Sequence, residues 1–196
     1  MARSARVPSP RREELLELAY RYALEHGLAE LSLRPLAAAI GSSPRVLLFL
    51  FGSKEGLVRA LLARARADEL VLLQRARQDG PHADLASVVR TTWGWLAAAR
   101  HRPLLTLWLE AYARSLVEPK GPWSEFARQT VADWLEVLSG AQDPLHRGSA
   151  GVAERTLALA VLRGALLDLL ATGEVERVTA AVHRHVGLLA QRSTGS

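Results

Sequence analysis

The stretch from residue 33 to residue 57, which reads LRPLAAAIGSSPRVLLFLFGSKEGL, constrains the possible fold of this chain more than any other. Gly41 separates two short apolar segments and predicts a tight turn between them. Ser43 followed by Pro44 is a strong start signal for a helix, and Ser53 gives a second start signal after the next glycine. Two short helices joined by a glycine turn are the skeleton of a helix-turn-helix.

The rest of the chain is helical by pattern. Apolar residues recur at helical spacing, and no stretch has the alternating β-branched pattern of a strand. We expect an all-α fold of about nine helices, with an N-terminal three-helix helix-turn-helix domain and a helical C-terminal domain. The expected helices span residues 11–26, 33–40 (capped by Ser32), 44–51, 54–78, 84–99, 103–116, 123–138, 152–171 and 174–190.

Composition and breaker residues suggest how the chain is divided. The predicted regions are a basic arm over 1–10, a helix-turn-helix domain over 11–56, a helical domain over 57–190 and a tail over 191–196. Arg3 and Arg6 lie in the arm among serine and proline. The arm is either a disordered tail or a segment that adds phosphate or minor-groove contacts beside a helix-turn-helix.

The charge and the missing cysteine narrow the class of protein. The net charge is +5, and only Lys54 and Lys120 are lysines, so arginine carries most of the positive charge. A modest basic excess fits nucleic-acid binding without requiring it. Without cysteine the chain has no disulfide or thiolate metal site, which suits a reducing cytoplasm. No apolar run approaches a membrane span, and the N-terminus is not a secretory signal.

The spacing within residues 11–60 resembles the N-terminal domain of TetR-family transcriptional regulators. The resemblance implies a ligand-responsive repressor that acts as a homodimer on a palindromic operator in double-stranded DNA. It also implies a small-molecule effector site in the helical body. The matching residues are Gly41, Ser43, Pro44, Leu47, Phe51, Ser53, Lys54, Glu55 and Leu57. The dominance of Ala, Leu and Arg separately suggests a GC-rich, bacterial genome.

The predicted DNA contacts come from the helix over residues 44–51 and from the start of the next helix. Arg45 is suited either to guanine O6 and N7 or to a phosphate. The helix start at Ser53 and Lys54 attracts a phosphate through free N–H groups and the helix dipole. The full predicted set is Ser42, Ser43, Arg45, Val46, Leu48, Phe49, Ser53 and Lys54.

The predicted recognition helix is unusually apolar. The TetR family usually has a tyrosine at the position of Leu48, and its hydroxyl meets a DNA phosphate. Three interpretations stay open. The helix contacts thymine methyl groups, or it binds weakly, or it has lost DNA binding and contacts a partner. We favour retained DNA binding, because the cap, the turn and the phosphate-facing positions are all present. In the weak-binding case the contacts come from Arg3, Arg6, Arg12, Arg34, Arg45 and Lys54.

All five tryptophans lie in the predicted body. They either fill a helical core or line a cavity between helices, where helical bundles hold small ligands. The family resemblance favours the cavity. The predicted lining residues are Trp95, Trp108 and Tyr112.

The last two predicted helices are hydrophobic on more than one face, so one face needs a partner. A second copy that supplies the same pair of helices would form a four-helix bundle, as in the family. The predicted dimerisation residues are Leu157, Val161, Gly164, Ala165, Val178 and Val182.

Catalytic signatures are missing from the sequence. It contains no G-x-S-x-G, G-x-G-x-x-G or G-x-x-x-x-G-K-[ST] motif, and no E-x-x-H pair for a metal site. We therefore expect no enzyme activity, no cofactor and no metal. The alternative function is a helical ligand-binding or interaction protein whose head no longer binds DNA specifically.

Overall fold

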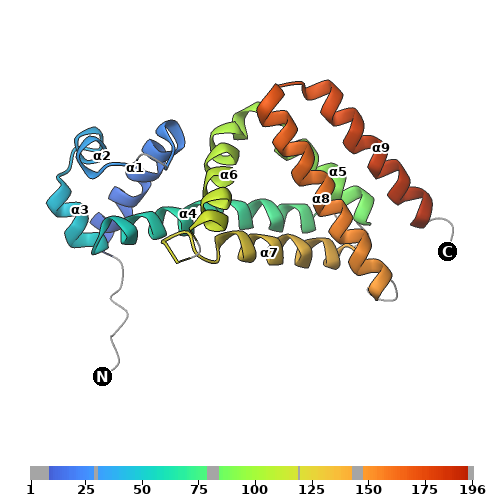
Figure 1. Cartoon of the computed structure of the whole chain (residues 1–196), viewed down its shortest axis with the longest axis horizontal. Helices are drawn as coiled ribbons and strands as arrows, with labels where there is room; N and C mark the ends of the chain where they lie inside the picture. Colours follow the sequence, from blue (N-terminus) through green and yellow to red (C-terminus); the bar gives the residue numbers. More distant parts are fainter. Residues whose placement is uncertain (1–8, 29–30, 79–83, 119, 143–147, 194–196) are drawn as a thin grey trace. The chain divides into compact units, whose positions relative to one another are not determined.

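The computed structural model describes residues 9–28, 31–78, 84–118, 120–142 and 148–193, and the described residues form helices and no strands (Figure 1). The predicted all-α fold is therefore confirmed. The helices are α1 (Pro10–His26), α2 (Leu33–Ala39), α3 (Pro44–Phe51), α4 (Lys54–Gln78), α5 (Leu85–Leu96), η1 (Ala99–His101, a 3₁₀ turn), α6 (Arg102–Val117), α7 (Phe126–Gly140), α8 (Ser149–Thr172) and α9 (Val175–Ser193). The arm was predicted over residues 1–10. Its first eight residues lie outside the described part of the chain.

Side-chain caps set several helix starts. Ser9 Oγ accepts a hydrogen bond from the Arg12 amide at 3.3 Å, so α1 begins at Pro10. Asp84 caps α5 by accepting from the Ser87 amide at 2.8 Å. Ser32 lies at the N-cap of α2, but its side chain makes no capping hydrogen bond, so the prediction for Ser32 was right in position and wrong in mechanism.

Some helix ends differ from the sequence prediction for local reasons. The backbone of Glu125 is left-handed, with φ 70°, so α7 cannot extend back to Trp123. His101 Nδ1 donates to the carbonyl oxygen of Trp95 at 2.8 Å, and α5 ends at Leu96 beside this contact. The last helix runs to Ser193, into the predicted tail.

The described chain forms two compact units. The first comprises Met1–Ala67 and Thr106–Ala127, and the second comprises Asp68–Leu105 and Arg128–Ser196. The predicted domain boundary after residue 56 therefore falls inside the first unit. This unit, which we call the head unit, also includes most of α6.

The head unit is held together by a small apolar core and by polar contacts between helices. Glu110 Oε2, on α6, accepts a hydrogen bond from the Leu28 amide at 2.8 Å, just after α1 ends at Gly27. Arg64, on α4, pairs with Glu17 and lies over the Tyr20 ring, 4.8 Å from its centroid. The fully buried core includes Leu15, Ala19, Leu36, Leu47, Leu57 and Leu61.

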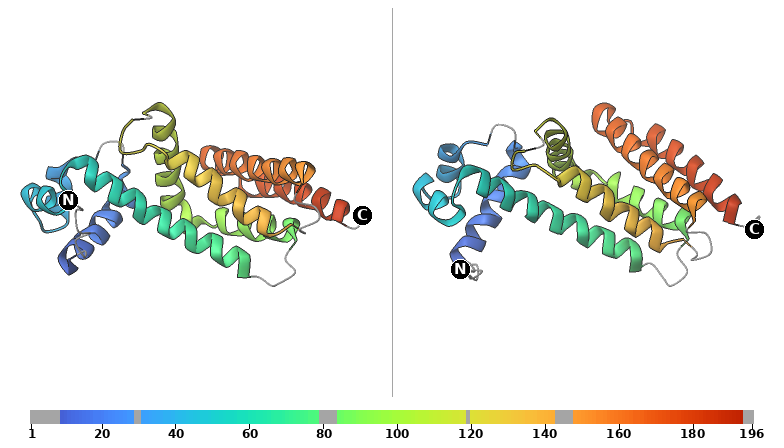
Figure 2. Two further views of the ribbon diagram at one scale, coloured as in Figure 1. Left: turned by 90° about the horizontal axis from the view of Figure 1, so that it is seen from below. Right: turned by 60° about the horizontal axis from the view of Figure 1, so that its bottom comes forward.

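The second unit, which we call the body unit, packs α5, α8 and α9 against one another. Figure 2 shows α8 and α9 side by side in both views. Trp93 is buried and its Nε1 donates to Thr179 Oγ1 at 3.0 Å, which links α5 to α9. Trp134 Nε1 donates to Glu69 Oε1 at 2.6 Å, so a buried carboxylate links α7 to the second half of α4.

The turn between α8 and α9 is built from a left-handed glycine and an ion-pair network. Gly173 has φ 73° and ends α8. Arg177 hydrogen-bonds both carboxylate oxygens of Asp168, at 2.6 and 2.8 Å, and also pairs with Glu174. The Arg177 hydrogen bonds are the main reason that the pKa of Asp168 lies below its ordinary value.

Candidate nucleic-acid interface

The two short helices of the head unit have helix-turn-helix geometry. The axes of α2 and α3 are bent by 103° relative to each other, within the range of about 90–120° that is typical of this motif. Gly41 adopts φ 63° in the turn, and the Ser42 amide donates to the Ala37 carbonyl at 2.8 Å. Leu36 and Leu47 are buried where the two helices meet. The turn predicted at Gly41 is present.

The start of α3 is fixed by its cap. Ser43 Oγ accepts a hydrogen bond from the Val46 amide at 3.3 Å, and Pro44 occupies the first turn. The Oγ of the half-buried Ser42 is itself buried and has no hydrogen-bond partner within the described part of the chain. In this conformation the Ser42 hydroxyl is not available to a DNA phosphate.

The outer face of α3 is apolar, with one cation. Leu47 and Phe51 point inward and are 1% and 9% exposed. Arg45 is exposed, and Phe49 is 81% exposed. Val46 and Leu48 are also on the surface, so these four predicted DNA contacts all reach solvent. The helix is therefore anchored by two apolar side chains and presents three others to solvent.

The start of α4 is joined closely to the end of α3. Ser53 Oγ accepts a hydrogen bond from the Gly56 amide at 3.0 Å, and Lys54 is exposed. A hydrogen bond from its own backbone, followed by one with Ser53, lowers the pKa of Glu55 below its ordinary value. A Cβ at position 56 would clash with the Phe51 carbonyl oxygen, so the backbones can approach this closely only with glycine. The sequence analysis did not single out Gly56. Its position between the capping residue Ser53 and the buried Leu57 could have indicated a close backbone contact.

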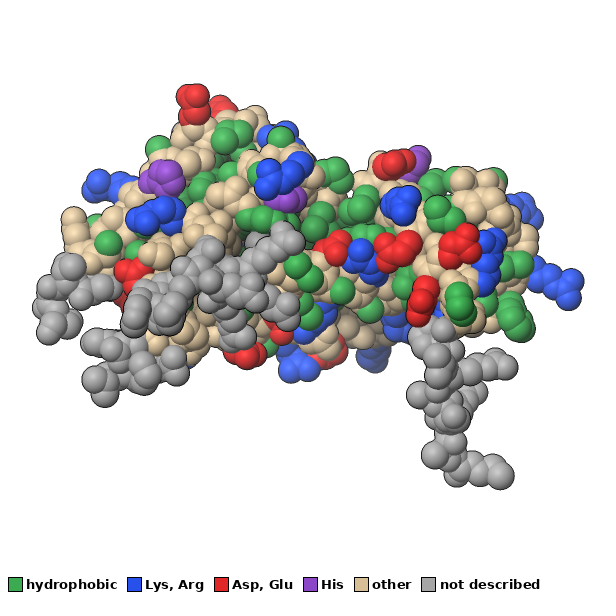
Figure 3. Space-filling model, turned by 180° about the vertical axis from the view of Figure 1, so that it is seen from behind, with side chains coloured by type: hydrophobic (Ala, Val, Ile, Leu, Met, Phe, Trp, Pro, Cys, Tyr) green, Lys and Arg blue, Asp and Glu red, His purple; other side chains and the backbone are tan. Residues whose placement is uncertain are grey.

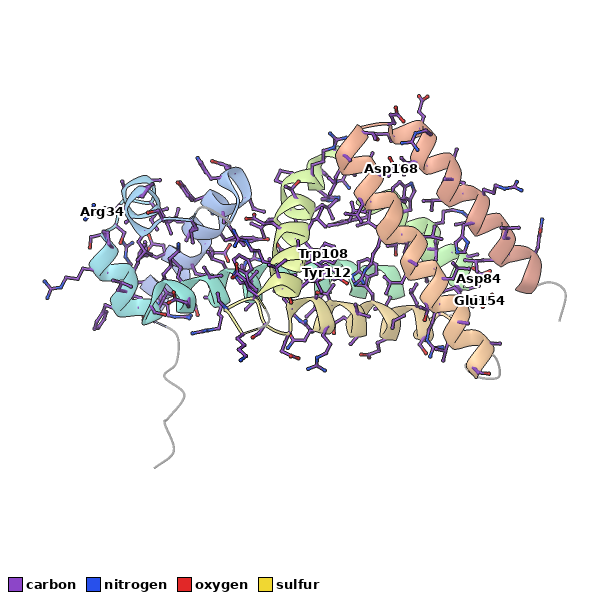
Figure 4. All side chains as sticks on the ribbon, viewed as in Figure 1. Arg34, Asp84, Trp108, Tyr112, Glu154 and Asp168 are labelled. Atoms are coloured by element: carbon purple, nitrogen blue, oxygen red, sulfur yellow. The ribbon has the colours of Figure 1, made fainter. Side chains whose placement is uncertain are left out.

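The segment that contains α2 and α3 carries only positive charges, up to Glu55 in the first turn of α4. Residues 31–54 contain Arg34, Arg45 and Lys54 and no acidic residue. Figure 4 shows the labelled Arg34 on the outer side of α2. In the space-filling view of Figure 3, Lys and Arg side chains lie next to exposed hydrophobic ones at the right-hand end, over α2 and α3. This pattern suits a polyanion with some apolar surface.

Of the other predicted cations, the structure describes Arg12, which points inward. The Arg12 guanidinium lies over the Phe51 ring, 4.9 Å from its centroid, and is half-buried. It supports the end of α3 from within. Arg3 and Arg6 lie outside the described residues.

The predicted effector residues fall in both units. Trp108 and Tyr112, one turn apart on α6, stack in the head unit with ring centroids 5.3 Å apart (Figure 4). Trp108 is nearly buried. Trp95 belongs to the body unit and stacks on His101, with centroids 3.8 Å apart.

The predicted dimerisation residues divide into two groups. Val178 and Val182, on α9, are 2% and 0% exposed, so they pack inside their own body unit in the single chain. Their predicted role in dimerisation stays a prediction. On α8, Leu157 is 54% exposed and Gly164 is exposed, while Val161 and Ala165 are half-buried.

A hollow of about 300 Å³ lies between α8 and α9 beside this exposed surface. Partial burial lowers the pKa of His185, because the charged ring loses hydration there, which favours a neutral ring. Leu188, which is 52% exposed, is a surface residue that the sequence pattern did not single out. The lining residues are Glu154, Leu157, His185, Leu188, Leu189 and Gln191.

Two kinds of feature are absent from the described ranges. No group of three or more His, Asp or Glu side chains in those ranges is arranged to hold a metal ion. No single described helix is long and apolar enough to cross a membrane; only the sharply bent pair α2 and α3 meets that criterion jointly, by length and composition.

The head unit thus contains a helix-turn-helix, and this part of the chain matches a known family model. Residues 15–61 match the model for bacterial regulatory proteins of the tetR family. No curated protein matches the chain in sequence. The chain has the fold of the TetR-family transcriptional regulators, and the match to the family model falls on the helix-turn-helix and the helices on either side of it.

Solved structures support the fold over nearly the whole chain. SCO4454, a TetR-family transcriptional regulator from Streptomyces coelicolor, is 20% identical with a TM-score of 0.76, covering 98% of this chain and 96% of that one. A TetR transcription regulator from Haloarcula marismortui is 18% identical with a TM-score of 0.67, over 92% and 97%. The multidrug binding protein EbrR, complexed with imidazole, is 24% identical with a TM-score of 0.67, over 94% and 96%.

We predict that Gly56→Ala destabilises the head unit by about 1–3 kcal/mol, because the new methyl group pushes α4 away from the end of α3. Chemical denaturation measures the change. The matched control is Gly94→Ala in α5, where a Cβ meets nothing within 4 Å and helix propensity raises stability by about 0.5–1 kcal/mol. Equal effects from the two substitutions would contradict the close approach.

Proposed function

We propose that this protein is a ligand-responsive transcriptional repressor that binds a palindromic operator as a homodimer. The observation that carries the proposal is α3, whose outer face is solvent-exposed beside Arg34, Arg45 and Lys54 within a TetR-type domain. A helix presented in this way fits the major groove of B-DNA.

The phosphate contacts of the proposal come from the start of α4 and from the exposed cations. Ser53 uses its hydroxyl to cap the helix by accepting from the Gly56 amide, and the helix dipole favours a phosphate at this end. Lys54 adds a full positive charge at the same helix end. Together they make an anion site that fixes the position of α3 on the duplex without reading its sequence.

The homodimer is proposed through the exposed side of α8 and α9. Leu157 and Leu188 project there, and Gly164 leaves open space into which a facing helix can pack. The hollow beside them takes an apolar side chain of a second copy. A two-fold dimer places two copies of α3 about one DNA turn apart, or a multiple of it, which is why we propose a palindromic operator.

The effector part of the proposal rests on α6. The Trp108–Tyr112 stack supplies an aromatic surface on this helix. Glu110, on the same helix, accepts a hydrogen bond from the Leu28 amide just after the end of α1. EbrR, a protein of the same fold, is a multidrug binding protein solved with imidazole. We propose that a small aromatic or cationic effector contacts this stack and thereby alters DNA affinity.

The two lysines of the chain provide a matched test of DNA binding. We predict that Lys54→Ala lowers affinity for duplex DNA and reduces the salt slope, d(log K)/d(log[salt]), by about 0.9 for each phosphate that the variant no longer neutralises. Lys120→Ala removes the same charge from an exposed site in the loop after α6 and leaves the slope unchanged. Fluorescence anisotropy over a salt series measures both. A protein that binds no duplex at low salt would instead support the alternative, a ligand-binding or interaction protein.

A second pair of variants tests the dimer. We predict that Leu188→Arg converts the protein to a monomer at micromolar concentration, because it brings a charge into the buried centre of the proposed interface. The control is Val117→Arg, at a residue that is 78% exposed at the end of α6. Sedimentation velocity distinguishes the species. A monomeric wild-type protein, or a dimer that withstands Leu188→Arg, would rule out this interface.

A further inference from the structure

We propose that Phe49 reads the C5-methyl group of thymine in the operator and so sets the base preference of α3. The inference rests on the proposed DNA-binding function and assigns the chemical group that α3 recognises. Phe49 is the aromatic residue between Leu48 and Leu50 in the apolar part of α3.

The exposure of Phe49 is not explained by the packing of the head unit. Leu47 and Phe51 already anchor α3 inside, and the Arg12 guanidinium covers the Phe51 ring. Phe49 is 81% exposed, the largest exposed fraction among the exposed large hydrophobic side chains of the described residues. A free ring in water is unfavourable, so contact with an apolar group would gain free energy.

The position of Phe49 directs it toward the same surface as the basic residues. Arg45 and Phe49 are four residues apart and lie on one face of α3, about 6 Å apart along the axis. Val46, three residues before Phe49, is exposed beside them. A duplex held by the exposed cations therefore meets the Phe49 ring directly.

The chemistry of the major groove then selects the partner group. A phenyl ring has no hydrogen-bond donor or acceptor, and the base edges in that groove present donors and acceptors apart from one apolar group, the thymine methyl. The cations and the missing acidic residues of segment 31–54 favour a polyanion over an apolar protein surface as the occupant. Thymine is therefore the base that Phe49 discriminates.

The test removes single methyl groups from the DNA. Duplexes that bind the purified full-length protein are selected from a random pool, and each thymine of the selected site is replaced in turn by deoxyuridine, which lacks only the C5-methyl. For the wild type we expect affinity to fall about three- to tenfold at one or more thymines in each half-site. For Phe49→Ala we expect thymine and uracil duplexes to bind equally.

The controls separate this inference from the proposed function. Val117→Ala, at an exposed valine on α6, retains the thymine preference. Melting curves confirm that Phe49→Ala is folded, as expected for a residue so exposed, and low salt keeps its electrostatic binding measurable. Salt-dependent binding by the wild type without any thymine preference overturns the inference alone, as does a preference that survives in Phe49→Ala. Failure to bind any duplex at low salt overturns the proposed function together with the inference.

Discussion

The contact on which the head unit depends is the close approach of two backbones, at the carbonyl of Phe51 and at Gly56. It brings the end of α3 against the first turn of α4, where Ser53 caps the new helix. Because a side chain at Gly56 would separate them, the angle at which α3 leaves the unit is set by the missing Cβ. The side chains that α3 presents to solvent depend on this close contact.

The short helix α3 has separate tasks on its two sides. Leu47 and Phe51 supply the inward anchors, and Arg12 stacks on the second of them. The outward side chains therefore take no part in the core, and they are available for contact with a binding partner. Three of the outward positions are apolar and the neighbouring cations supply the charge. In the DNA complex that we propose, affinity and base preference therefore come from different residues.

Much of this was predictable from sequence, because caps and turns are local. Gly41, Ser43, Pro44 and Ser53 specify the helix-turn-helix through contacts with residues a few positions away. Contacts between distant residues were not predictable: Val178 and Val182 looked like partner contacts, yet the packing of α5 and α8 buries them. The grouping of α6 with the head unit likewise depends on contacts such as Glu110 with Leu28, which no periodicity encodes. The roles of the DNA, effector and dimer residues stay predictions.

We propose that the outer face of α3 and the start of α4 meet a DNA duplex. Hydrogen exchange of the full chain, with and without a selected duplex, tests it most directly, because it locates the contact without changing any residue. The account predicts slower exchange at the backbone amides of residues 43–56 when DNA is bound. Protection confined to other helices, with exchange over residues 43–56 unchanged, would contradict it.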